Sequence, residues 1–174
     1  SINPIFGKIG IHELGKDLVG EYAERFFFNR AIPFDLPLAV SPIQIPEDDF
    51  GLAEITSGFN KTTMISPLHA TILSAAVANR GTIMEPWLIK TITDEKGGVL
   101  YSRNPARLAS PMSAETARKM RELMYETVMK GTARKAFKPM QKKKALHAIE
   151  LGAKTGTIND PVDAGALGTV TLNH

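Results

Sequence analysis

The chain has 174 residues, of which 43% are hydrophobic and 22% charged, as is typical of a folded globular domain and not of a disordered segment. It contains no cysteine, which excludes disulfide scaffolds, zinc–thiolate sites and thiol nucleophiles. Its four histidines lack the spacing of metal ligands. The net charge of +3 is small, and few aromatic residues accompany the basic ones, so the sequence does not indicate a nucleic-acid surface. We therefore expect neither a metal, nor a cofactor, nor a nucleic-acid partner.

The N-terminal third predicts two helices and a loop. Asn3-Pro4 is typical of a helix start with Asn3 as the cap, and the apolar face that follows is broken at Gly10. A second amphipathic helix is predicted over residues 16–26. Four prolines between residues 31 and 46 exclude a regular element there, so we expect an extended loop packed by its apolar residues.

The middle of the chain predicts one helix and one hairpin. Ser66-Pro67 again reads as cap and first turn, and the helix should run from residue 67 to 79 and stop at Gly81. It is apolar on nearly all sides, which predicts a position inside the core. Residues 87–93 alternate as a strand that starts at a core Trp87, 94–98 form a turn, and 99–101 pair back.

The last part predicts a helix, a loop and a strand. Ser113 should cap a helix over 114–130 that ends at Gly131; its predicted inner face is Ala117, Met120, Leu123, Met124, Thr127 and Val128. The basic stretch from Arg134 to Lys144 is interpreted as a solvated loop, and residues 149–158 as a strand. The predicted class is α+β, with helices packed on an antiparallel sheet.

The strand predicted at the end contains Lys154-Thr155-Gly156-Thr157. On a sheet edge, Lys154 and Gly156 would face one side and Thr155 the other, and the glycine would let another backbone approach. An extended peptide could then lie alongside, with the ammonium and hydroxyls holding a carboxylate. Taken alone, Lys154-Thr155-Gly156 is weak evidence for a functional site, and Ser1-Ile2-Asn3 alone is weaker.

Together, Ser-x-Asn followed 153 residues later by Lys-Thr-Gly resembles two of the three motifs of penicillin-binding proteins and serine β-lactamases. Longer stretches carry the resemblance to class B penicillin-binding proteins further, up to about residue 159: SINPIFGKIG, SPLHATILSAAVANRGTIMEPWL, SAETARKMRELMYETVMKGTA and GAKTGT. The resemblance implies a β-lactamase/transpeptidase-like fold. It also implies a D,D-transpeptidase that cross-links peptidoglycan stem peptides through an acyl-serine and is acylated by β-lactams.

The resemblance also implies roles for single residues. Ser1 would relay protons near the leaving group, supported by Lys154, and Asn3 would bind the substrate backbone. Thr155 and Thr157 would bind the terminal carboxylate, the Thr157 N–H would serve the oxyanion hole, and Gly156 would keep the strand edge open.

The sequence departs from the family pattern in one motif. None of the serines has lysine three positions later, so Ser-x-x-Lys, which holds the nucleophile, is absent from the chain. We expect the nucleophile upstream of Ser1, and residues 1–174 to be a partial, by itself inactive, transpeptidase domain with a sheet incomplete at both ends. Dimerisation or strand exchange of such a fragment is a further expectation.

Two other functions remain open: a β-lactam sensor or β-lactamase-like hydrolase, and a non-catalytic peptide-binding or scaffold module. The resemblance implies an extracytoplasmic location, an anchor to the cytoplasmic membrane outside this segment, and membership of a wall-synthesis complex. His12, His69 and His147 are interpreted as packing or surface residues.

Overall fold

A computed structural model describes residues 2–141, 143–144 and 148–156. The chain divides into two units, Ser1–Ser113 and Ala114–His174, and each is described by itself. In each unit the buried apolar residues form a core of their own.

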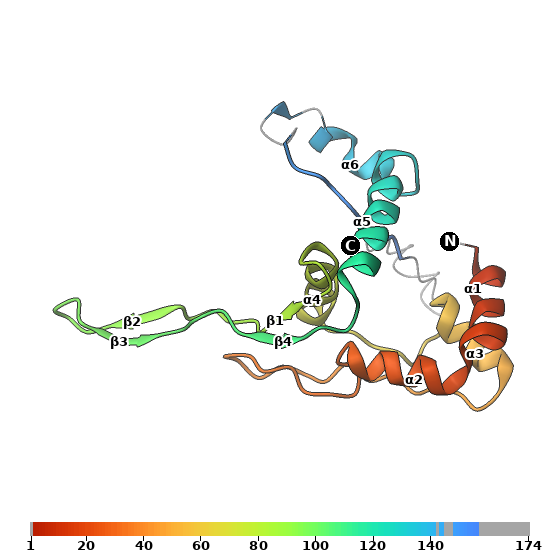
Figure 1. Ribbon diagram of the computed structural model, residues 1–174, viewed down its shortest axis with the longest axis horizontal. Coiled ribbons are helices and arrows are strands. Elements are labelled where there is room, and N and C mark those ends of the chain that lie inside the picture. Colours follow the sequence, from red (N-terminus) through yellow and green to blue (C-terminus); the bar gives the residue numbers. More distant parts are fainter. Residues whose placement is uncertain (1, 142, 145–147, 157–174) are drawn as a thin grey trace, which may run out of the picture. The chain divides into compact units, whose positions relative to one another are not determined.

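The first unit begins with helical turns that pack on a helix the sequence analysis missed. These turns are α1 (Asn3–Ile9), η1 (Gly10–Leu14) and α2 (Gly15–Arg25), and α1 lies along α3 (Asp49–Ser57), as Figure 1 shows. Asp48 caps α3 by accepting from the Gly51 N–H at 2.9 Å, and Gly58 ends it with a φ of +73°. Both are ordinary end signals, so α3 was readable from sequence.

Two details of α1 correct the predictions. The helix begins at Asn3 and Ile2 occupies the cap position, so Asn3 is not the cap. Gly10 does not break the helix, because a π-helical turn continues through it and the break falls at Gly15, where φ is +70°. Gly10 instead permits close packing: a Cβ there would lie 2.2 Å from Thr56 Oγ1 of α3.

The proline-rich segment 31–46 contains no helix or strand, as predicted. Asn29 fixes it at one end, since its side-chain amide donates to the Ile43 carbonyl at 2.8 Å and its Oδ1 accepts from the Ile43 N–H at 2.9 Å. The Asn29 N–H also donates to the Ser41 carbonyl at 2.9 Å. Side-chain and backbone hydrogen bonds therefore hold this loop in addition to apolar packing.

Helix α4 (Pro67–Ala78) confirms the predicted start and stop. The Ser66 hydroxyl accepts from the His69 N–H at 3.2 Å, and Gly81 turns the chain with a φ of +86°. Only one face is buried, however, at His69, Ile72 and Ala76, while the opposite face is exposed. The prediction of burial on all sides was wrong because the helix packs on the core through that single stripe. His69 is a packing residue, as predicted, with Nε2 2.6 Å from the Phe26 carbonyl oxygen.

Within the described residues the strands form two antiparallel sheets of two strands each. β1 (Ile83–Met84) pairs with β4 (Arg107–Ala109), and β2 (Thr91–Thr93) pairs with β3 (Val99–Ser102). The β2–β3 hairpin was predicted, although its first strand begins at residue 91 and not at Trp87, which is half-buried. β1 carries Ile83 into the core beside Ile72 and Ala76 of α4.

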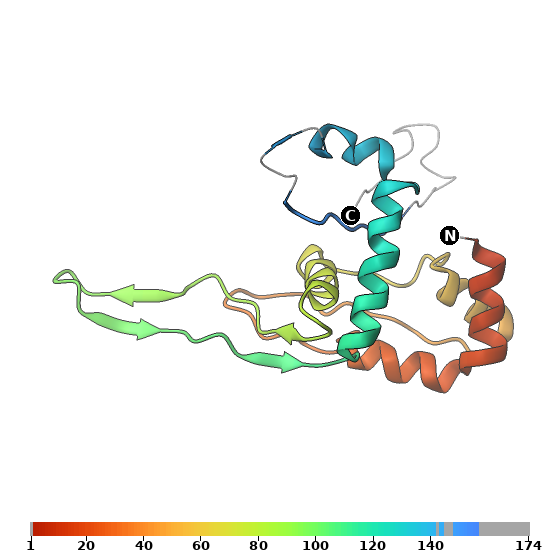
Figure 2. The ribbon, with the colours of Figure 1, turned by 45° about the horizontal axis from the view of Figure 1, so that its top comes forward.

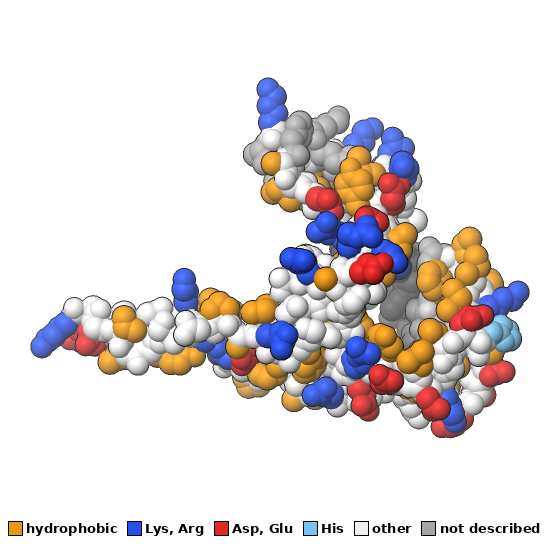
Figure 3. Space-filling model, in the orientation of Figure 1, with side chains coloured by type: hydrophobic (Ala, Val, Ile, Leu, Met, Phe, Trp, Pro, Cys, Tyr) orange, Lys and Arg blue, Asp and Glu red, His pale blue; other side chains and the backbone are white. Residues whose placement is uncertain are grey.

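The hairpin runs on from β1 and β4 and away from α4 in both views (Figures 1 and 2). Apolar side chains cover part of its surface (Figure 3), and Ile92, Val99, Leu100 and Tyr101 are among the exposed ones.

The second unit is built on α5 (Ala114–Met129) and α6 (Arg134–Gln141). Ala117 and Val128 form the buried face of α5, but Met120 and Leu123, predicted to face inward, are 41% and 64% exposed. The predicted basic loop is wrong over residues 134–141, which are helical. Phe137 packs on the core residues Val128 and Ala133, and this contact stabilises the helix. The contact offsets the low helix propensity of Pro139 and the repulsion between the lysines and arginine of this segment.

The mixed class of helices and antiparallel sheet agrees with the prediction, and α4 packs on β1 as expected of such a fold. Among the helices of the described residues, none combines the length and the apolarity that crossing a membrane requires.

Candidate active site

The segment that contains Lys154 returns to the end of α5 and packs on it. The Ala153 N–H donates to the Met124 carbonyl at 3.0 Å, and Ala153 is buried with Val128 and Ala133. A Cβ at Gly152 would lie 3.1 Å from Met124 Cβ, so the chain passes close to the helix here. We call residues 128–133 together with 151–155 the corner. Backbone bonding and apolar contact thus fix the segment just before Lys154.

Lys154 is exposed, and its ammonium donates to the Thr155 carbonyl at 2.7 Å. The group is therefore held against the backbone of its own segment, and that contact involves no carboxylate. An exposed ammonium in this position raises the local positive potential beside the strand.

Thr155 is half-buried, and its Oγ1 lies 2.7 Å from the hydroxyl oxygen of Thr132. Either hydroxyl can be the donor in this pair. Thr132 follows Gly131 at the end of α5, and the sequence analysis did not single it out. Only its place three residues after the end of α5, inside the stretch MKGTA that resembles the family, could have pointed to it.

Gly156 is exposed, and among the described residues, its chain neighbours aside, none places an atom within 4 Å of the point where a Cβ would be. There is room beside the backbone at this point. A neighbouring extended chain needs such room to pair with a strand edge.

The remaining predicted site residues are placed as follows. Asn3 is exposed at the first position of α1 and belongs to the first unit, so it is described there alone. Ser1 and Thr157 lie outside the described residues. Of the predicted site residues in the second unit, the structure describes Lys154, Thr155 and Gly156, which are consecutive in the sequence.

The predicted strand over 149–158 is wrong for residues 149–154, which are not in a ladder, and Thr155 forms a single bridge. Residues 157 and 158 lie outside the described part. Strand pairing depends on partners far away in sequence, and the alternation of residues alone does not supply them.

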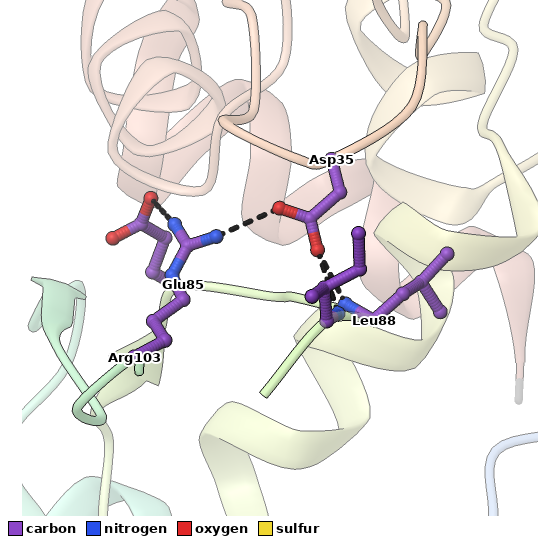
Figure 4. A network of polar contacts seen from close by, with 5 residues as sticks. Asp35, Glu85, Leu88 and Arg103 are labelled. Atoms are coloured by element: carbon purple, nitrogen blue, oxygen red, sulfur yellow. Dashed lines mark hydrogen bonds and ion pairs between the residues drawn. The ribbon is translucent and has the colours of Figure 1, made fainter. Parts of the chain in front are cut away.

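A second polar cluster lies in the first unit, shown in Figure 4. The Asp35 carboxylate accepts from the N–H groups of Leu88 and Ile89 at 2.7 and 3.0 Å, and Arg103 donates to its other oxygen at 2.8 Å. Arg103 also bonds Glu85 at 2.5 Å. We call this cluster the Asp35 brace, because it ties the proline-rich loop to the base of the hairpin.

The brace changes the titration of its carboxylate. The backbone N–H groups of Ile89 and Leu88 lower the pKa of Asp35 below its ordinary 3.8, and Arg103 lowers it further. The side chains of Arg103, Asp35 and Glu85 are 20%, 19% and 23% exposed, so solvent weakens these charge interactions but does not remove them.

Comparison with known proteins gives a family and relatives. The penicillin-binding protein transpeptidase domain family matches residues 1–165. Penicillin-binding protein 4 of Bacillus subtilis is 30% identical over 125 residues, which is 72% of this chain and 18% of that protein. The peptidoglycan D,D-transpeptidase PbpA of Mycobacterium tuberculosis is 26% identical over 169 residues, or 94% of this chain and 31% of that protein.

Solved structures agree on the fold. The D,D-transpeptidase domain of a peptidoglycan glycosyltransferase from Eggerthella lenta superposes with a TM-score of 0.77 at 27% identity, covering 91% of this chain and 40% of that one. The penicillin G acyl-enzyme complex of M. tuberculosis penicillin-binding protein A gives 0.75 at 25% identity, covering 92% and 34%. The chain thus spans less than half the length of each of these four relatives.

Proposed function

The chain belongs to the penicillin-binding protein transpeptidase domain family, and from that membership we propose that it supplies the second and third active-site motifs of a peptidoglycan D,D-transpeptidase. The observation that carries the proposal is the Lys154–Gly156 segment. It is fixed at its start by Ala153, and within the described part of the chain no residue beyond its neighbours crowds Gly156, which leaves room for an extended peptide to pair there.

The proposed reaction is acyl transfer in two steps. A serine oxygen attacks the penultimate D-Ala carbonyl of a stem peptide, the C–N bond breaks, and terminal D-Ala leaves with a proton on its amine. The amine of a neighbouring stem then attacks the ester and restores the serine hydroxyl. This serine is proposed to belong to a Ser-x-x-Lys motif upstream of Ser1, in a longer protein of which residues 1–174 are part.

The residues of this chain would bind and orient the substrate. In the proposal Ser1 passes the proton to the leaving amine, and Lys154 supports it with its charge. Asn3 bonds the peptide backbone. Thr155 and Thr157 donate to the terminal carboxylate, and the Thr157 N–H serves the oxyanion hole, a contact typically worth about 3 kcal/mol.

The substrate of this reaction lies outside the cytoplasmic membrane, so the proposal places the domain there, anchored by a segment beyond these residues. Its proposed partners are the peptidoglycan stem peptide and β-lactams, within a wall-synthesis complex. A relative has been solved as a penicillin G acyl-enzyme, which supports the β-lactam part of the proposal.

The test is the intact mass of the full-length protein after exposure to penicillin G, with the modified peptide mapped. The proposal expects one stable adduct on a serine upstream of Ser1. Absence of any adduct would overturn the enzyme assignment in favour of a binding module. Rapid loss of the adduct as hydrolysed penicillin would indicate a lactamase, and an adduct within residues 1–174 would show that the nucleophile was misplaced.

A further inference from the structure

The contact between Thr132 and Thr155 joins two elements that are 23 positions apart in sequence. The two hydroxyl oxygens are 2.7 Å apart, a normal distance for an O–H···O hydrogen bond. Thr132 stands between the ends of α5 and α6, while Thr155 is the middle residue of the candidate substrate strand.

Thr132 is fixed from both sides. The Ala133 N–H donates to the Thr127 carbonyl at 3.2 Å, and Ala133 is buried against Val128 and Ala153. A Cβ at Gly131 would lie 2.8 Å from Thr127 Cα, so the turn that precedes Thr132 is tight. The position of the Thr132 hydroxyl is therefore set by the packed corner.

The number of protons available on the two hydroxyls determines which of them donates this hydrogen bond when a carboxylate is bound. A threonine hydroxyl has one proton to donate and two lone pairs that accept. A carboxylate is acceptor only, so Thr155 can bind it only by donating its single proton. In that state Thr155 has no proton left for Thr132, and the 2.7 Å contact persists only if Thr132 is the donor.

We propose that Thr132 is a positioning residue for carboxylate recognition: it donates to Thr155 Oγ1 and so directs the Thr155 proton toward the ligand carboxylate. This inference rests on the proposed function, in which Thr155 binds that carboxylate. Hydrogen bonds in a chain polarise one another, so the donation from Thr132 also strengthens the bond from Thr155. No proton changes owner, and Thr132 does not touch the ligand.

The role predicts a dependence on ligand charge that a merely structural residue would not show. The probes are penicillin G, which carries the carboxylate, and penicillin G methyl ester, which does not. We expect Thr132→Val in the full-length protein to slow acylation by penicillin G by up to about tenfold, the upper end of what one neutral hydrogen bond is worth. Acylation by the methyl ester should change less than about twofold.

Three further variants sharpen the test. Thr132→Ser keeps the hydroxyl and should restore the rate with penicillin G. Thr127→Val removes a hydroxyl that bonds the Leu123 carbonyl within α5 and should leave both rates unchanged. Thr132→Val combined with Thr155→Val should be no slower than Thr155→Val alone, because the first residue acts through the second.

Equal slowing of acylation by penicillin G and by its methyl ester would overturn the positioning role. So would a double variant in which the rate losses of the two single variants multiply. If Thr132→Val lowers the melting temperature, the ratio of the acylation rates with penicillin G and its methyl ester is measured for Thr132→Val and for Thr132→Ala. Loss of folded protein reduces both rates alike and leaves this ratio unchanged, whereas loss of the positioning role lowers it. A wild-type protein that penicillin G does not acylate would overturn the proposed function and this inference with it. A wild-type protein that is acylated while Thr132→Val matches it with both ligands would overturn this inference alone.

Discussion

The corner and the Asp35 brace fix two irregular segments by different means. At the corner, buried Val128, Ala133 and Ala153 and one backbone bond hold the chain that leads to Lys154. At the brace, one carboxylate holds the Leu88 and Ile89 backbone and an arginine. Apolar packing has no protonation state, whereas a carboxylate does, so the two regions should respond differently to substitution and to pH.

The largest effect on stability is expected from overpacking the corner with Ala153→Leu. Ala153 is 3% exposed and packs with Val128 and Ala133, so the larger side chain has to enter this buried cluster, and we expect about 2 kcal/mol of destabilisation. Displacement of Lys154 should also slow penicillin acylation of the full-length protein by about tenfold, which is less than the roughly hundredfold loss expected when an acting group is removed altogether. Thermal melting and the acylation rate measure the two effects; wild-type values for both would mean that the corner does not position the strand.

A cavity at the same place should cost slightly less. Val128 is fully buried, and Val128→Ala removes two methyl groups, which predicts a loss of about 1.5–2 kcal/mol in unfolding free energy. Val99→Ala in the exposed hairpin is the matched control and should change stability by less than about 0.5 kcal/mol. Denaturant unfolding of both variants tests this, and equal losses would contradict the assigned core.

The helices show how far sequence reasoning reached. Ser66 and Gly81 predicted the ends of α4 because capping and left-handed turns are local events. Helix α6 was missed because Phe137 packs on a core cluster that includes Val128 of α5 and Ala153, and these two residues lie outside the helix and its local sequence. The strand expected from Trp87 failed for the same reason, since the Leu88 and Ile89 N–H groups bind the distant Asp35.

The candidate site residues were named from the motif, whereas their contacts were not predicted. The motif placed Lys154, Thr155 and Gly156 in one segment, but the bond to Thr132 depends on how α5 ends and α6 begins. A sequence motif identifies the residues that contact a ligand, but it does not identify the residues that position those ligand-binding residues.

Substitution in the Asp35 brace should destabilise the protein less than substitution in the corner does. Arg103→Met removes the cation that joins Asp35 and Glu85 and leaves two carboxylates near each other. We expect faster amide exchange at Leu88 and Ile89, without loss of the fold of either unit. Lys96→Met, at the exposed hairpin turn, is the control that should leave those amides unchanged. Unaltered exchange in Arg103→Met would show that the arginine adds nothing to the brace.

The smallest expected effect is the one that separates the regions by pH. The folded pKa of Asp35 is below the ordinary 3.8, so its contribution is complete above that pH and is lost as pH falls through the folded pKa. Protection of the Leu88 and Ile89 amides, corrected for intrinsic exchange, should therefore fall as the pH drops below the ordinary 3.8 of the carboxyl, while the Ala153 amide should stay protected. Asp35→Asn should abolish the pH dependence; an equal fall at all three amides would mean general acid unfolding.

The most direct test of the account is the penicillin acylation rate of the full-length protein with Lys154→Ala, against Lys143→Ala as the matched control. Both lysines are exposed and lie in the second unit, so loss of one charge is common to both variants. The account predicts a loss of about a hundredfold or more for Lys154→Ala, the usual cost of removing a group that acts at the reacting atoms, and no change for Lys143→Ala. Equal rates in the two variants would contradict the claim that the Lys154–Gly156 segment is the active-site strand.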